Sequence, residues 1–184
     1  MKKHDNPNYE SFANSTYSKP FSPRQILPKF VIEHAKKIRR KPSNIKILDF
    51  GAGRDIFGTK MIREAGFDCT AWEIGANFNK ELHDYHALKR KYDIVFASNV
   101  LNVQPTIEDT IAIMVDVRNN LLVEQERGGY FFCNFPMKPR HNGMTDMQLE
   151  MHLKSVFNRW DKYGNLVEKV APMVWKCQNV GLRI

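Results

Sequence analysis

A strand, a glycine-rich turn and a helix follow one another in KILDFGAGRDIFGTKMI, residues 46–62. The segment opens with residues that suit a buried strand, places three glycines within eight positions and then returns to a helical pattern. Such a unit offers free backbone N–H groups to a polar or anionic ligand. It also requires a sheet whose strands are joined by helices, which restricts the chain to α/β folds.

Two nucleotide-binding motifs match this turn in part. The octapeptide GRDIFGTK comes close to a phosphate loop, but that motif has its lysine directly after the last glycine, where this chain has Thr59. Lys60 comes one position later and is rotated by about 100° about the helix axis, so it points elsewhere. The dinucleotide fingerprint needs a third glycine where this chain has Ile56, and a bulky residue there argues against a tightly held pyrophosphate.

An acidic residue at the end of the next predicted strand indicates which kind of ligand the turn binds. Asp49 precedes Gly51 and Gly53, and Glu73 follows Gly53 by 20 residues. At that separation a carboxylate can accept hydrogen bonds from both hydroxyls of a ribose. These residues therefore favour a ligand that contains a ribose.

Strands and helices alternate along most of the chain. Strands are predicted at NIKILDF, FDCTAWE, YDIVFAS, GGYFFCNF, NLVEKV and MVWKCQ, and YDIVFAS should be central because residues 94–97 are continuously apolar. Helices are predicted from Ser22 to the basic segment KKIRRK, over about residues 56–65, after Thr106 and after Thr145. This order predicts a doubly wound α/β fold, with a mostly parallel sheet, helices on both faces and an antiparallel edge.

Composition and charge indicate the cellular compartment and the binding partners to expect. Residues 1–21 show no sustained period, so we expect a mobile N-terminal extension before a single domain at residues 22–184. The apolar runs are too short for a membrane span, and three widely spaced cysteines suit neither disulfides nor zinc, which favours a reducing cytoplasm. The net charge of +8 favours polyanionic partners such as DNA or RNA, although a merely basic, solvated surface explains it too.

Three segments in order, ILDFGAGRD, AWEI and YDIVFASNVLNV, resemble the class I S-adenosylmethionine-dependent methyltransferases. The resemblance covers about residues 45–135, and the two closing strands are similar to the hairpin that ends the family's sheet. It implies a seven-stranded sheet whose last strand is antiparallel. It also implies S-adenosylmethionine as the cofactor and methyl transfer as the activity.

The resemblance also assigns roles to single residues. The Asp49–Gly53 turn would hold the methionine part of the cofactor, Glu73 the ribose hydroxyls, and Ile74 the adenine ring. Residues just past the central strand would line the methyl-transfer site. The implied cofactor contacts are Asp49, Gly51, Ala52, Gly53, Glu73, Ile74, Ser98 and Asn99.

The catalytic residues are less well specified. Family members that methylate DNA amines carry Asp/Asn/Ser-Pro-Pro-aromatic after this strand, whereas residues 99–102 read NVLN, so methylation of a base amine by that motif is in doubt. Methyl transfer needs positioning, and a base only for a poor nucleophile. We expect Asn99 and Asn102 to be catalytic, with His141 and Asp146 as further candidates for a base.

The segment NFPMKPRHNGM has the composition of a substrate-covering loop, and we expect Lys138, Arg140 and His141 to bind the acceptor. Nucleic acid is the favoured acceptor on charge; a small molecule, a protein, or a cofactor-binding module without catalysis are the alternatives. His83 and His86 lie in a polar segment where surface histidines are more common than metal ligands, so no metal is expected.

Overall fold

The computed structural model describes residues 26–124, 128–138, 140–158 and 166–180. The expected N-terminal extension, residues 1–21, and the expected helix start at Ser22 lie outside the described residues. No helix in the described ranges is both long enough and apolar enough to cross a membrane.

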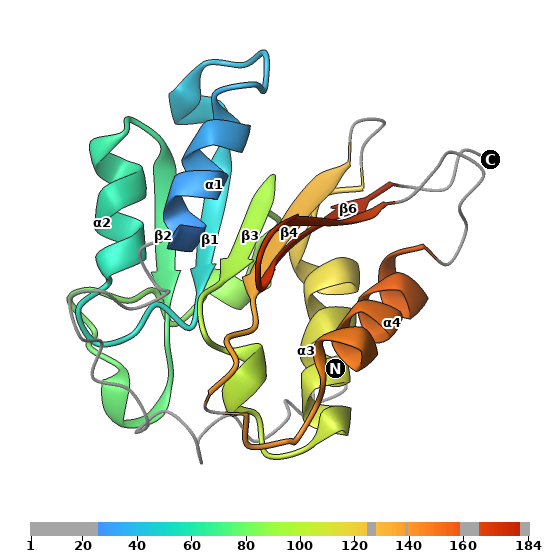
Figure 1. The fold of residues 1–184 in the computed structure, drawn as a ribbon. Helices are drawn as coiled ribbons and strands as arrows, with labels where there is room; N and C mark the ends of the chain where they lie inside the picture. Colours follow the sequence, from blue (N-terminus) through green and yellow to red (C-terminus); the bar gives the residue numbers. More distant parts are fainter. Residues whose placement is uncertain (1–25, 125–127, 139, 159–165, 181–184) are drawn as a thin grey trace.

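Six strands form one sheet in the order β2-β1-β3-β4-β6-β5 (Figure 1). Their bounds are β1 (Lys46–Phe50), β2 (Asp68–Trp72), β3 (Ile94–Ala97), β4 (Gly129–Asn134), β5 (Val167–Ala171) and β6 (Val174–Asn179). β2, β1, β3 and β4 run parallel, and β6 is antiparallel to both β4 and β5. The mostly parallel sheet, its antiparallel last strand and the central place of residues 94–97 are confirmed.

The described residues form six strands rather than the expected seven. Between β2 and β3 the chain makes two short 3₁₀ turns, η4 (Gly75–Asn77) and η5 (Ala87–Lys89), and no strand. This stretch is rich in charged and polar residues and has no run of β-branched residues, so it lacks the side chains with which a strand packs. β2 is therefore the edge of the sheet on this side.

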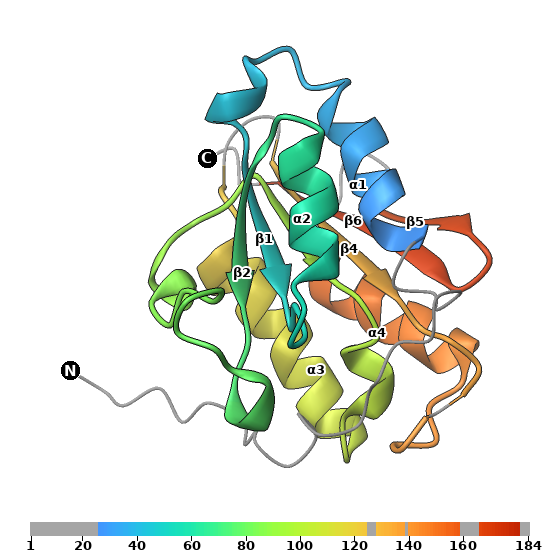
Figure 2. The ribbon, with the colours of Figure 1, turned by 90° about the vertical axis from the view of Figure 1, so that its left-hand side faces the viewer.

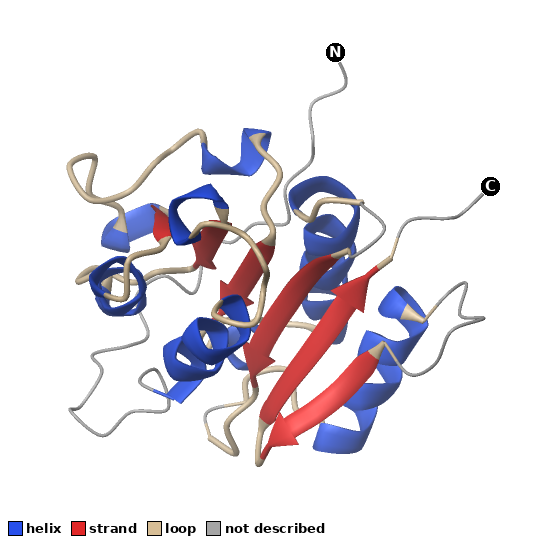
Figure 3. Cartoon of the chain, turned by 90° about the horizontal axis from the view of Figure 1, so that it is seen from above, coloured by secondary structure: helices blue, strands red, loops and turns tan. Residues whose placement is uncertain are grey.

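Helices cover both faces of the sheet, as expected (Figures 2 and 3). α1 (Ile26–Ala35) and α2 (Phe57–Glu64) pack on one face, and α3 (Ile107–Asp116) and α4 (Asp146–Phe157) on the other. The predicted caps at the starts of α3 and α4 are present: Thr106 accepts the Asp109 N–H, and Thr145 and Gln148 form a full capping box. A five-residue π turn (Val117–Leu121) continues α3.

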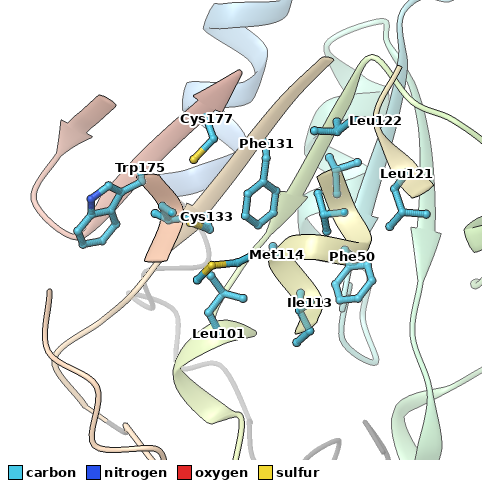
Figure 4. Close-up of a cluster of buried hydrophobic side chains, with 14 of the residues drawn as sticks. Phe50, Leu101, Ile113, Met114, Leu121, Leu122, Phe131, Cys133, Trp175 and Cys177 are labelled. Carbon is cyan, nitrogen blue, oxygen red and sulfur yellow. The ribbon is translucent and has the colours of Figure 1, made fainter. Parts of the chain in front are cut away.

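The alternation of side chains along the strands divides the core into two layers. On the α1 and α2 face, Ile47 and Ile94 of the sheet pack with Leu27 of α1 and Ile62 of α2. On the other face lies the larger cluster, which includes Phe50, Leu101, Ile113, Met114, Phe131 and Trp175 (Figure 4). All these side chains are at most 2% exposed, and together they fix the strand ends that carry the site.

The three cysteines belong to this core. Cys69, Cys133 and Cys177 are free thiols in β2, β4 and β6, and all three are buried. Burial raises the pKa of each thiol well above its ordinary value. Cys133 therefore acts as a small core residue and not as a nucleophile.

α1 ends at Ala35, earlier than its sequence suggested. The basic segment KKIRRK, residues 36–41, follows as turns instead of forming the last helical turn. Its side chains are mostly exposed, while Arg40 is paired with Asp93, the residue before β3, at 2.5 Å. This segment and the start of β1 lie at the amino-terminal edge of the parallel strands.

Candidate functional site

The expected cofactor residues meet at the opposite, carboxyl-terminal edge of the parallel strands. The turn after β1, Glu73 after β2 and Ser98 after β3 all leave the sheet here, because the three strands are parallel and in register. In open α/β sheets, ligands bind at this edge, outside the carboxyl ends of the strands. The fold therefore brings the predicted residues together from separate parts of the chain.

The backbone of the glycine turn adopts a conformation that residues with a Cβ could adopt only with strain. Gly51 and Gly53 have φ values of +75° and +72°, in the left-handed region. The N–H groups of Gly51 and Ala52 both donate to the carbonyl of Trp72, at 3.0 and 2.9 Å, and tie the turn to the end of β2. A Cβ at Gly51 would lie 2.6 Å from Cγ2 of Val100, so glycine also allows close packing against the end of β3.

Helix α2 approaches the sheet closely through a glycine outside the dinucleotide fingerprint. Ile56, at the fingerprint's third position, has φ +47° and is buried against Ala52. Gly58, two positions later, makes the close approach: a Cβ there would lie 2.9 Å from Oδ2 of Asp49 and 3.1 Å from the Phe96 ring. The turn thus differs from a dinucleotide site in the way its helix packs.

Asp49 is held in place by Thr59, the residue that stands where a phosphate loop would have its lysine. Asp49 is only 2% exposed, and Oγ1 of the fully buried Thr59 donates to its Oδ2 at 2.9 Å. Lys60, by contrast, is exposed on the outer side of α2. Thr59 therefore orients a carboxylate, and Lys60 does not reach the turn as a phosphate-loop lysine would.

Glu73 is buried against the turn and is not a solvated strand end. Its side chain is 8% exposed. Oε2 accepts the Gly53 N–H at 2.8 Å, and Oε1 accepts the N–H of Ile74 at 2.9 Å. Both carboxylate oxygens are thereby fixed beside the turn.

His83 also belongs to the site, although sequence reasoning placed it on the surface. It is 5% exposed, and its Nε2 lies 2.9 Å from the Gly53 carbonyl oxygen. His86, three residues later, is exposed as expected. Nothing local in HDYH distinguishes the two histidines, so no sequence signal could have found His83. Across the described ranges, no three His, Cys, Asp or Glu side chains come together as metal ligands.

The end of β3 carries a reciprocal pair of amides. Asn99 has φ +58°, and its N–H donates to Oδ1 of Asn134 at 2.6 Å. Nδ2 of Asn134 donates back to Oδ1 of Asn99 at 2.7 Å. Asn134 ends β4 and is 2% exposed. The sequence offered one signal for it, since Asn134 is a polar residue at the end of an otherwise apolar strand.

A small pocket lies between these elements. It is lined by Asp49, Gly51, Ala52, Phe57, Gly58 and Ser98. Oγ of Ser98 is shielded from solvent and has no hydrogen-bond partner among the described residues. A buried hydroxyl without a partner costs free energy, so its place in the pocket suits a polar ligand.

The loop after β4 is fastened over the carboxyl edge of the sheet. The His141 N–H donates to the Asn102 carbonyl at 3.1 Å, and Nδ2 of Asn142 donates to Oγ1 of Thr110 at 2.8 Å. The Asn102 side chain is 1% exposed, whereas His141 is exposed. A methyl acceptor can therefore contact His141 at the surface, whereas the Asn102 side chain is buried.

Arg140, expected to bind the acceptor, points inward. Its guanidinium group pairs with Asp146 and donates to the carbonyls of Phe135, Pro136 and Met144 at 2.9–3.2 Å. It also lies over the Phe135 ring, 4.4 Å from the centroid. These contacts join the loop to the start of α4, so Arg140 is a structural clamp, and of the expected acceptor residues Lys138 and His141 are the exposed ones.

Asp146, a candidate base, is engaged in the same network. Burial alone would raise the pKa of this carboxyl, but hydrogen bonds from Arg140 and Lys169 hold the pKa below its ordinary value. Asp146 therefore stays ionised and paired with two cations. These contacts give it a structural role at the start of α4.

The three basic segments lie at different places relative to this edge. Residues 36–41 precede β1 and lie at the amino-terminal edge, at the top of Figure 1. Residues 89–91 precede β3, and Arg90 pairs with Asp84, whose N–H donates to the Ala71 carbonyl of β2. The third basic segment, with Lys138 and Arg140, follows β4 at the carboxyl edge. Its arginine is the inward-facing clamp.

Solved structures match this chain, although no protein-family model and no curated protein sequence does. The magnesium protoporphyrin IX methyltransferase from Synechocystis PCC 6803, solved with bound SAM, is 13% identical, with a TM-score of 0.59 over 94% of this chain and 90% of its own. The plantazolicin methyltransferase BpumL, solved with SAH, is 12% identical, with a TM-score of 0.57 over 93% and 95%. Identities this low establish the fold alone: this chain has the class I, Rossmann-like fold of the S-adenosylmethionine-dependent methyltransferases.

Proposed function

We propose that this protein is an S-adenosylmethionine-dependent methyltransferase whose cofactor site is the turn after β1 together with Glu73. The observation that carries this proposal is the fixed carboxylate of Glu73, whose Oε2 accepts the Gly53 N–H at 2.8 Å. It places an acidic group that can accept ribose hydroxyls beside a turn that a ligand can approach closely.

Three further observations fit that cofactor. Gly51 and Gly58 let the turn and the start of α2 pack closely against Val100 and Asp49, which fixes the shape of the turn beside the pocket. Ser98 contributes a shielded hydroxyl without a partner among the described residues, inside the same pocket as Asp49. The carboxylate of Asp49 is oriented by Thr59, so it can accept a donor such as the amino group of a methionine moiety.

When bound, S-adenosylmethionine supplies an electrophilic methyl group on a sulfonium sulfur. The residues of this chain position the reactants: Glu73 and the turn hold one partner, and Ser98 and Asn99 line the adjoining space at the end of β3. Positioning of this kind can lower a barrier substantially without a general base. Asn134 fixes the orientation of Asn99 through two hydrogen bonds. We retain Asn99 as the residue nearest to the transfer step.

The acceptor is the least specified part of the proposal. A nucleic acid would need cations beside the transfer site, yet residues 36–41 are at the other edge of the sheet, Arg90 is paired with Asp84, and Arg140 faces inward. Lys138 and His141 are the exposed polar side chains of the loop after β4 that remain for such a role. These positions favour a small-molecule or protein acceptor, and a nucleic-acid acceptor stays a prediction to be tested.

Titration calorimetry tests the cofactor site. Wild-type protein is expected to bind S-adenosylmethionine and S-adenosylhomocysteine, whereas binding of ATP or NAD alone would refute the proposal. Glu73→Ala is expected to weaken binding by about 1–3 kcal/mol, because ribose hydroxyls lose their acceptor. Glu73→Gln, which keeps one acceptor oxygen, should lose less, and the exposed Glu64→Ala on α2 is the matched control that should bind normally.

Two assays separate the remaining alternatives. Formation of S-adenosylhomocysteine with cell extracts favours an enzyme, and tight binding without turnover in any extract favours a non-catalytic binding module. Filter binding of DNA and RNA at several salt concentrations tests the nucleic-acid acceptor. If Lys138 contacts phosphate, Lys138→Ala should reduce the log–log salt slope by about one contact. Negligible binding at low salt would eliminate nucleic acid.

A further inference from the structure

The Gly53 peptide is held from both sides by buried side chains. Its N–H donates to Oε2 of Glu73 at 2.8 Å, and its carbonyl oxygen lies 2.9 Å from Nε2 of His83. Both side chains are less than 10% exposed. Glu73 is 20 residues from Gly53 along the chain and His83 is 30, so tertiary structure alone creates this two-sided contact.

The hydrogen-bond network assigns the tautomer of His83. The Gly53 carbonyl can only accept, so its 2.9 Å contact requires a proton on Nε2, and Nδ1 then accepts the Asn79 N–H at 2.9 Å. The Asn79 carbonyl is also near Nδ1, at 3.1 Å, but it cannot bond there while Nδ1 accepts. The proton is therefore on Nε2, and His83 donates it to the Gly53 carbonyl.

His83 belongs to the segment between β2 and β3, which runs along the outer side of β2. This segment is anchored to the sheet by the Asp84 N–H, which donates to the Ala71 carbonyl at 2.9 Å. Leu82 packs against the cluster of Ala52 and Ile56 beneath the turn. Because β2 has no strand on its outer side in the described residues, residues 79–84 form the outer wall of the glycine turn.

We infer that His83 is a positioning residue for the cofactor, through the hydrogen bond that it donates to the Gly53 carbonyl. This inference rests on the proposed function. Glu73 touches both the turn and, as proposed, the ribose, so the angle between turn and carboxylate must be fixed for both contacts to form together. His83 fixes it by holding the other side of the same peptide. Without this bond the Gly53 carbonyl would keep only the 3.3 Å hydrogen bond from the Ile56 N–H, and the turn would be held less firmly.

Two substitutions separate the two hydrogen bonds of His83. In His83→Gln the amide nitrogen reaches the position of Nε2, so the bond to Gly53 is kept and the bond from Asn79 is lost. In His83→Asn the shorter amide reaches only the position of Nδ1, so the bond from Asn79 is kept and the bond to Gly53 is lost. His86→Gln and His86→Asn, at an exposed site in the same segment, are the matched controls.

The probe is S-adenosylhomocysteine, titrated by calorimetry into each full-length protein. We expect His83→Asn to weaken binding about tenfold, and His83→Gln to stay within about threefold of wild type, as should both His86 variants. A merely structural histidine would instead lower the unfolding temperature of both His83 variants without this split in affinity. Equal affinities for His83→Asn and His83→Gln would overturn the inference and leave the proposed function standing.

A second measurement does not depend on any variant. Long-range ¹H–¹⁵N spectra of the cofactor-free protein should show the His83 proton on Nε2, and a proton on Nδ1 would overturn the inference. If wild-type protein binds no S-adenosylhomocysteine at all, the proposed function fails and the inference fails with it. That outcome differs from the one in which wild-type protein binds normally and His83→Asn and His83→Gln bind with equal affinity, which overturns the inference alone.

Discussion

The amide pair at the end of β3 gives the most direct test of how the site is held. Asn134→Ala removes both hydrogen bonds to Asn99, of 2.6 and 2.7 Å. At about 0.5–1.5 kcal/mol for each bond, we expect the free energy of unfolding to fall by about 1–3 kcal/mol. Asn134 is 2% exposed, so water cannot easily replace it as the partner of the Asn99 N–H.

Asn99→Gly should behave differently, because its backbone is left-handed at φ +58°. Glycine removes the side-chain bond but relieves a conformation that costs L-residues about 1 kcal/mol, so the net change should be near zero. Asn99→Gly keeps the backbone N–H that donates to Asn134. In that background Asn134→Ala should therefore cost only one bond, and the coupling energy should be about 1 kcal/mol.

Urea denaturation of the four proteins measures the cycle, and Asn44→Ala, at an exposed asparagine, should change stability by less than about 0.5 kcal/mol. A cost below about 0.5 kcal/mol for Asn134→Ala, or a coupling energy of zero, would refute the reasoning. Asn99 would then be oriented by something other than this pair, and Asn134 would lose its assigned role.

The remaining predictions concern the turn, the loop after β4 and the pH dependence of stability. Gly51→Val should abolish cofactor binding in calorimetry, because any Cβ there lies 2.6 Å from Val100; unchanged affinity would contradict the close packing. Arg140→Ala should speed proteolysis of the loop after β4 without changing the salt slope of nucleic-acid binding, and a smaller slope would restore Arg140 as a phosphate contact. Burial, aided by Lys176 and Lys37, lowers the pKa of His34 from 6.5 to about 4, so the unfolded state binds more protons between these values. The stability that neutral His34 contributes is complete above pH 6.5 and is lost as the pH falls toward 4. His34→Gln should therefore make the urea midpoint of unfolding depend less on pH between these values. If the midpoint of this variant varies with pH as that of the wild type does, the effect does not come from His34.

The sequence by itself determined the features that depend on neighbours along the chain. Capping residues placed the starts of α3 and α4, because an N-cap contacts N–H groups within its own turn. The continuously apolar stretch of β3 marked a strand buried on both faces, and the glycines after β1 marked a backbone with positive φ. Once the strands are parallel, their carboxyl ends must share an edge. The meeting of Asp49, Glu73 and Ser98 therefore followed from the order of elements.

Only the tertiary structure decided which polar side chains face the site. His83 and His86 are equivalent in sequence, but one is buried against Gly53 and the other is exposed, because the path of residues 79–84 over the edge of the sheet separates them. The sequence suggests that Arg140 is a surface cation, but its guanidinium group points inward and binds Asp146 and three backbone carbonyls. Such choices depend on partners brought together by the packing of whole elements. Desolvation and hydrogen-bond satisfaction at those contacts act across the fold, and no local pattern of residues encodes them.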